Sequence, residues 1–145
     1  MNKKNNQAKR VFSKEIKGDE KLIHDVQFYL IRKGLKPYIE HWLVFDSNDG
    51  RYMGFNKSFS VQQLKGMNVR HPDLFVPELK LVIEIDGNEK NNIHEFKVTN
   101  TEKRNQMYKD GGLDLIVITP KELKIYGLTW QDYLKRNLYE LFHII

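Results

Sequence analysis

The sequence predicts an α/β sandwich, in which a mixed central β-sheet is flanked by helices. Segments with helical spacing of apolar residues are interspersed with short apolar segments that are typical of strands. Residues 81–85 are apolar at both alternating sets of positions apart from Glu84, which indicates a central strand covered on both faces. The length of 145 residues suits one domain. We therefore expect a single domain over residues 18–145, preceded by a basic arm over residues 1–17.

The N-terminal half predicts a helix, a strand and a long excursion from the core. The helix begins near Asp19, and Gly34 suits its C-terminal end. Residues 38–45 alternate in polarity like a strand. Residues 46–68 are rich in Asn, Ser, Gly and Lys and contain the hairpin-type turn Asp49-Gly50. Long excursions of this kind are often functional. The helix is inferred from the spacing of Leu22, Ile23, Val26, Leu30 and Lys33.

The C-terminal half predicts three more strands and two helices. Residues 69–76 and 79–86 form a strand pair that is joined through Pro77-Glu78. A capping box of Thr99 and Glu102 predicts a helix to Lys109, which ends at two glycines. A buried strand over residues 113–119 and a helix from Thr129 follow, with Pro120 ending the strand. The expected order is therefore αβββαβ plus a C-terminal helix.

Composition limits the classes of protein and of partner. The chain has 24 Lys and Arg against 19 Asp and Glu, a formal charge of +5, and a pI of about 9.3. A positive surplus favours a polyanionic partner such as DNA, because neutralised phosphates release their counterions. There is no cysteine, which excludes disulfides and cysteine-ligated zinc. No apolar run suits a membrane helix or a signal peptide, so we expect a cytoplasmic protein without a membrane partner.

Three acidic residues predict the functional site. Glu84 and Asp86 lie on one face of the strand 79–86, because strand side chains alternate between faces. A turn centred on Glu78-Leu79 places Val76 opposite Leu81, and the same register places Asp73 opposite Glu84. It also places His71 opposite Asp86, although Pro72 can introduce a bulge. The opposite face then carries the apolar residues Leu74, Val76, Leu81, Ile83 and Ile85.

Carboxylates crowded on a buried strand are unfavourable without a ligand, since like charges repel and burial penalises an unpaired charge. A hard divalent cation removes the cost, because Mg²⁺ prefers carboxylate and water oxygens. The alternative is that the sheet edge leaves these groups in water, or that Lys and Arg pair with them. With Asp73, Glu84 and Asp86 in register, the pattern favours a metal site holding Mg²⁺, with Mn²⁺ as a substitute.

These residues resemble a known pattern. Pro72-Asp73 followed by Glu84-Ile85-Asp86-Gly87 is similar to the motif of the PD-(D/E)XK nuclease superfamily. The likeness is greatest to the branch of very-short-patch repair endonucleases and related small nuclease-like proteins of phages and bacteria, and it spans residues 19–119. That branch also carries an acid in its first helix, here Glu20, and a helix with a basic residue, here Lys103 or Arg104. The resemblance implies a restriction-endonuclease-like core and a metal-dependent DNA endonuclease.

The implied chemistry is hydrolysis of a phosphodiester bond by a metal-bound water. His71, or His94 in the following loop, would accept or orient the water's proton. Lys103 or Arg104 would stabilise charge on phosphorus, and Glu20 would assist metal binding. One departure is that Asp86 stands where the superfamily has Lys, which leaves a binding-only protein of the same fold as the alternative. The candidate DNA contacts are Lys9, Arg10, Arg51, Lys57, Arg70, Lys90, Lys97 and Arg104.

The sequence leaves the nature of the partner open. The excursion carries Arg51, Tyr52, Phe55, Lys57 and Phe59. These residues either contact the nucleic acid and stack on unpaired bases, or form a hairpin that packs its own aromatic residues or makes a dimer contact. RNA could replace DNA as the substrate, because the chemistry is similar. Cutting both strands would call for a homodimer with two active sites. A protein interaction module without nucleic-acid binding is also compatible with the sequence.

Overall fold

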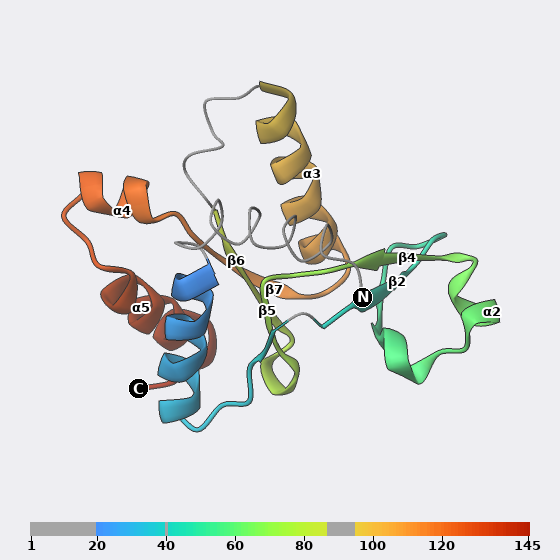
Figure 1. Cartoon of the computed structure of the whole chain (residues 1–145), viewed down its shortest axis with the longest axis horizontal. Helices are drawn as coiled ribbons and strands as arrows, with labels where there is room; N and C mark the ends of the chain where they lie inside the picture. Colours follow the sequence, from blue (N-terminus) through green and yellow to red (C-terminus); the bar gives the residue numbers. More distant parts are fainter. Residues whose placement is uncertain (1–19, 40, 87–94) are drawn as a thin grey trace, which may run out of the picture.

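The computed structural model describes residues 20–39, 41–86 and 95–145, with side chains of the last range from residue 101 onward. It has a mixed four-stranded sheet, helices on both of its faces and a second sheet of three strands (Figure 1). The α/β class and the mixed central sheet predicted from sequence are confirmed. No helix in the described part of the chain is long and apolar enough to cross a membrane.

The central sheet has the strand order β1-β5-β6-β7. Its strands are β1 (Tyr38–Ile39), β5 (Leu74–Val76), β6 (Leu81–Ile85) and β7 (Asp114–Ile118). β5 is antiparallel to β1 and β6, whereas β6 and β7 are parallel and are connected through helix α3 (Glu95–Asp110). All five residues of β6 are buried, as expected of a strand covered on both faces.

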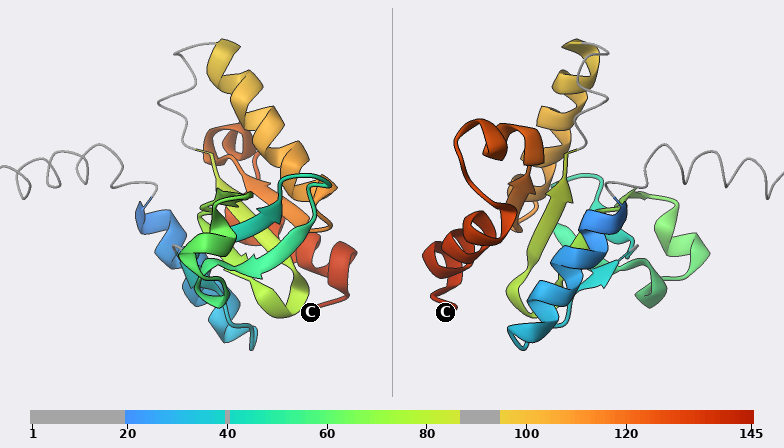
Figure 2. Two further views of the ribbon diagram at one scale, coloured as in Figure 1. Left: turned by 90° about the vertical axis from the view of Figure 1, so that its right-hand side faces the viewer. Right: turned by 60° about the vertical axis from the view of Figure 1, so that its left-hand side comes forward.

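One face of this sheet packs against three helices. These are the N-terminal helix, over residues 20–32, and helices α4 (Pro120–Ile125) and α5 (Trp130–Phe142) (Figure 2). Thr129 caps α5, because its side chain accepts a hydrogen bond from the Asp132 amide. The sheet residues on this face include all five that the alternating pattern predicts: Leu74, Val76, Leu81, Ile83 and Ile85.

The other face packs against α3 and the second sheet. Phe75 and Val82 of the central sheet contact Tyr108 of α3 and Leu43 and Phe45 of the second sheet in one buried cluster. The second sheet has the order β3-β2-β4, with β2 (Leu43–Asp46), β3 (Tyr52–Phe55) and β4 (Met67–Arg70) all antiparallel. The excursion is therefore a packed layer.

One antiparallel pair of chain segments, residues 38–46 and 67–76, runs through both sheets. Tyr38 pairs with Phe75 in the central sheet, and Leu43 pairs with Arg70 in the second sheet, so the register is unchanged across both. The strands predicted over 38–45 and 69–76 are each divided in two by a short interruption. Pro72 lies in this interruption, and it has no N–H to continue a ladder. The interruption matters because Asp73 lies at its end.

One further local prediction is corrected, and three short elements were not predicted. The helix predicted from Thr99 extends from Glu95, so Thr99 is inside α3 and does not cap it. Pro120 occupies the first turn of α4, where its missing N–H costs nothing. The excursion holds a 3₁₀ turn, Asn56–Ser58, and a short helix α2, Val61–Leu64, whose capping box joins Ser60 and Gln63. The Asp49-Gly50 turn is confirmed, with Gly50 at a φ of 76°.

Candidate functional site

Glu84 is the one charged residue of the described part of the chain that is buried, with 3% of its surface exposed. It lies in the fourth position of β6, between two isoleucines that face the helices α4 and α5. Strand alternation therefore turns its carboxylate to the opposite face, toward α3. A buried acid in an otherwise apolar strand is costly unless partners compensate it, so its surroundings indicate what the site is for.

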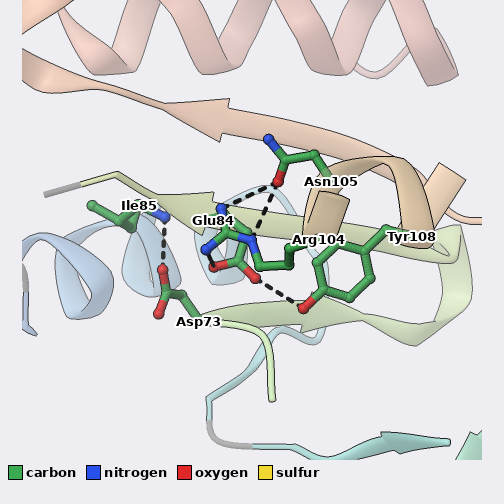
Figure 3. Close-up of polar contacts among 6 residues, drawn as sticks. All are labelled: Asp73, Glu84, Ile85, Arg104, Asn105 and Tyr108. Carbon is green, nitrogen blue, oxygen red and sulfur yellow. Dashed lines mark hydrogen bonds and ion pairs between the residues drawn. The ribbon is translucent and has the colours of Figure 1, made fainter. Parts of the chain in front are cut away.

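Asp73 is the first partner. The β5–β6 ladder pairs Val76 with Leu81 and ends at Leu74 with Ile83, as the sequence predicts. Asp73 lies one residue before that end, at a bend, and its Oδ2 accepts a hydrogen bond of 2.7 Å from the Ile85 amide (Figure 3). The carboxylate thus takes the place of a strand carbonyl, which holds it beside Glu84.

Helix α3 supplies two more partners, four residues apart and therefore on one face of the helix. The Tyr108 hydroxyl donates a hydrogen bond of 3.1 Å to Glu84 Oε2. Arg104 Nη1 lies 3.7 Å from Glu84 Oε1, the one ion pair found among the described residues. Figure 3 shows both side chains reaching the carboxylate from the helix, while Asp73 approaches it from the strand below.

The electrostatics around Glu84 and Asp73 favour the binding of a positive charge between the two carboxylates. Burial, and then the neighbouring Asp73 carboxylate, raise the pKa of Glu84 from its ordinary 4.5 to about 8, although Arg104 opposes the shift. Burial and Glu84 also raise the pKa of the Tyr108 hydroxyl, which stays a neutral donor. At neutral pH the carboxyl pair therefore retains a proton unless a further cation replaces it.

The donor set suits a divalent cation with few protein ligands. Asp73 and Glu84 provide two adjacent carboxylates, and Mg²⁺ is commonly held by one or two carboxylates, waters and substrate phosphates. Asp86 does not complete a group of three: among the side chains described over residues 20–39, 41–86 and 101–145, no three acidic, histidine or cysteine residues converge as metal ligands. Asp86 follows the end of β6, and its amide donates to the Ile118 carbonyl at 2.9 Å.

The remaining predicted site residues lie apart from this pair. The ladder ends before it would pair His71 with Asp86, and the exposed His71 ring instead lies 5.4 Å from that of Trp42. Glu20 and Lys103 are exposed on their helices, and so are the predicted DNA contacts Arg51, Lys57 and Arg70. Lys9, Arg10, Lys90 and His94 lie outside the described residues, as does the side chain of Lys97.

Two features of the site were not assigned from the sequence. The sequence assigns Tyr108 no role in the site, and it predicts Arg104 as a phosphate contact rather than as the partner of Glu84. The available signal was their four-residue spacing on the helix that follows the acidic strand. In the excursion, Tyr52 and Phe55 are partly buried and pack against the core cluster that includes Phe75 and Tyr108.

Comparison with known proteins adds no assignment, since no family model, curated protein or solved structure matches the chain.

Proposed function

We propose that the chain is a divalent-metal-dependent DNA endonuclease, with Asp73 and Glu84 as the metal ligands. The observation that carries the proposal is the pairing of a buried Glu84 on β6 with Asp73, whose carboxylate is held by the β6 backbone. A buried carboxylate beside a half-buried one destabilises the fold unless a proton or a cation separates their charges. A site that costs stability and is held rigidly is typical of a functional centre.

The ligand set favours Mg²⁺ or Mn²⁺. The oxygens are hard donors, and the described part of the chain shows no histidine within the carboxylate pair. Such a cation polarises a phosphoryl oxygen and lowers the pKa of a bound water. The chain's own residues orient the ligands: the Ile85 amide holds Asp73, and the Tyr108 hydroxyl holds Glu84.

The substrate class rests on charge and on fold. The net charge of +5 favours a polyphosphate, and Arg51, Lys57 and Arg70 are exposed basic residues on or beside the second sheet. A restriction-endonuclease-like core is supported by the first helix, the antiparallel β5–β6 pair with acids at its open end, and the α3 crossover to parallel β7. RNA is the alternative substrate.

The test is a cleavage panel of supercoiled, mismatched and branched DNA, run with Mg²⁺, with Mn²⁺ and with chelator. Asp73→Asn keeps an oxygen to accept the Ile85 amide, and Glu84→Gln keeps one for Tyr108, so each removes charge while preserving the hydrogen bond. We expect each variant to lose cleavage by at least about 100-fold and to retain DNA binding. Glu122→Gln, an exposed change on α4, is the matched control. Wild-type cleavage by both site variants would overturn the proposal.

A binding-only protein of the same fold is the second candidate. Without a metal, Tyr108 already donates a hydrogen bond to one oxygen of Glu84 and Arg104 forms an ion pair with the other, and Asp86 stands at the position of the motif Lys. This candidate predicts salt-sensitive DNA binding with no cleavage in either metal. Failure of every substrate to be cut, together with unchanged DNA affinity in chelator, would decide in its favour.

A further inference from the structure

The contact between Arg104 and Glu84 is an ion pair without a hydrogen bond. The Nη1 to Oε1 distance is 3.7 Å, whereas charge-assisted hydrogen bonds between these groups are about 2.7–2.9 Å. The guanidinium directs its hydrogen bonds to Asn105 Oδ1 instead, at 3.3 Å from Nε and 3.1 Å from Nη2. Arg104 is therefore attracted to the carboxylate but is not locked onto it.

The surroundings of the two partners differ. The Glu84 side chain is 5% exposed and the Arg104 side chain is 32% exposed. Glu84 is held by the strand and by Tyr108, while Arg104, whose side chain is partly exposed, reaches it from α3 (Figure 3). If one partner moves, it is Arg104, because a long side chain at a partly wet helix surface changes rotamer at little cost.

Two cations compete for one carboxylate pair. A divalent ion on Asp73 and Glu84 would neutralise the charge that attracts Arg104 and would repel the guanidinium. A released guanidinium beside the metal is well suited to a phosphate, because its planar fork matches phosphate oxygens. Arg104 would then leave Glu84 and place its positive charge beside a phosphate.

We propose that Arg104 is an exchangeable counter-ion: it pairs with Glu84 when no divalent cation is present, and it turns to a DNA phosphate when the cation binds. This inference rests on the proposed function, since it assumes that Asp73 and Glu84 hold the metal. It adds that DNA binding and metal binding reinforce one another through one side chain.

If Arg104 competes with the metal, its removal should raise the affinity for the metal, whereas removal of a residue that assists metal binding would lower it. Arg104→Gln keeps the stem and removes the charge, so the cation no longer displaces a competitor. In the absence of DNA, and above pH 8 so that no proton on Glu84 competes, we expect Mn²⁺ to bind about three- to tenfold more tightly than to wild type. Lys109→Gln removes the same charge from an exposed position of the same helix, and it is the matched control with unchanged Mn²⁺ affinity.

The second consequence concerns DNA. Ca²⁺ replaces Mg²⁺ so that binding is measured without cleavage, and EDTA provides the metal-free state. In EDTA, Arg104→Gln should bind duplex DNA as wild type does, because Arg104 is then engaged with Glu84. In Ca²⁺ the Arg104→Gln variant should bind DNA less tightly than wild type. The slope of log affinity against log salt should become shallower by the amount that corresponds to about one phosphate contact.

The experiment uses the full chain, with Mn²⁺ titrated by electron paramagnetic resonance and DNA binding followed by fluorescence anisotropy. Tighter Mn²⁺ binding by Arg104→Gln, with its DNA defect confined to Ca²⁺, supports the exchange. Unchanged or weaker Mn²⁺ binding, or an equal DNA defect in EDTA, overturns it. If Glu84→Gln abolishes Mn²⁺ binding while Arg104→Gln leaves it unchanged, the exchange fails and the proposed metal site stands. Absence of Mn²⁺ binding in wild type and Arg104→Gln alike, with DNA present, overturns both.

Discussion

Replacement of Glu84 by glutamine should stabilise the metal-free protein at neutral pH, because Glu84 resists ionisation in the folded chain. Its pKa is raised from 4.5 to about 8, so between these values the folded state holds a proton that the unfolded state has lost. The free energy of unfolding that Glu84 contributes is then fully present below pH 4.5. It falls as the pH rises, until it levels off above pH 8. The side-chain amide of the Glu84→Gln variant does not titrate, so the substitution removes this slope.

The size of the stability change follows from the pH range between the two pKa values of Glu84. Each pH unit between the two pKa values costs about 1.4 kcal/mol, so wild type should lose about 2.5 kcal/mol relative to Glu84→Gln between pH 5.5 and pH 7.5. The comparison with the variant cancels the contributions of histidines and of other groups that titrate in both proteins.

The assay is urea unfolding of both proteins in EDTA, followed by circular dichroism at the two pH values. We expect the stability of Glu84→Gln to exceed that of wild type by more at pH 7.5 than at pH 5.5. Addition of Mn²⁺ at 100 times its dissociation constant should then stabilise wild type by about 2.7 kcal/mol. The stability of the Glu84→Gln variant should not change. Parallel pH dependences in EDTA would refute the argument that burial and Asp73 keep Glu84 protonated.

Three other changes test the packing around the site. Tyr108→Phe removes the hydrogen bond to a buried Glu84 oxygen and should cost about 1–2 kcal/mol in urea unfolding; an unchanged midpoint would mean that the bond is absent in solution. Gly111→Ala would place a Cβ 2.7 Å from Phe45 Cε2, so we expect a loss of about 1–3 kcal/mol, and a neutral effect would show that the ring moves freely. Leu134→Ala empties a fully buried position on α5 and should cost about 2–5 kcal/mol, whereas a much smaller loss would contradict its place in the core.

The local pattern of the sequence was sufficient for the strand pair that carries the site. The alternation of apolar residues across Leu74 to Ile85 and the tight turn after Val76 together specify one register, because a slip of one residue would move every apolar side chain to the wrong face. That register is why Asp73 and Glu84 were correctly placed together. The C-terminal helix and its Thr129 cap were predicted for a similar reason, since they depend on residues within one or two turns.

The sequence pattern was insufficient wherever two segments distant in the chain meet. The segments 38–46 and 67–76 are divided between two sheets according to the layer against which each part packs. The alternation of apolar and polar residues is the same in both parts, so it does not predict the division. Asp86 has the correct parity to join Glu84, yet β6 ends at Ile85, and strand periodicity does not predict where a ladder stops.

The sequence by itself determined the α/β class, the acidic strand end and the pairing of Asp73 with Glu84, because periodicity and turn chemistry act over a few residues. Only the tertiary structure decided that Glu84 is the buried acid, that Arg104 and Tyr108 of α3 meet it, and that Asp86 stands outside the pair. The physical reason is that the crossover through α3 sets which helix face meets the sheet, and this choice is made by packing across the core.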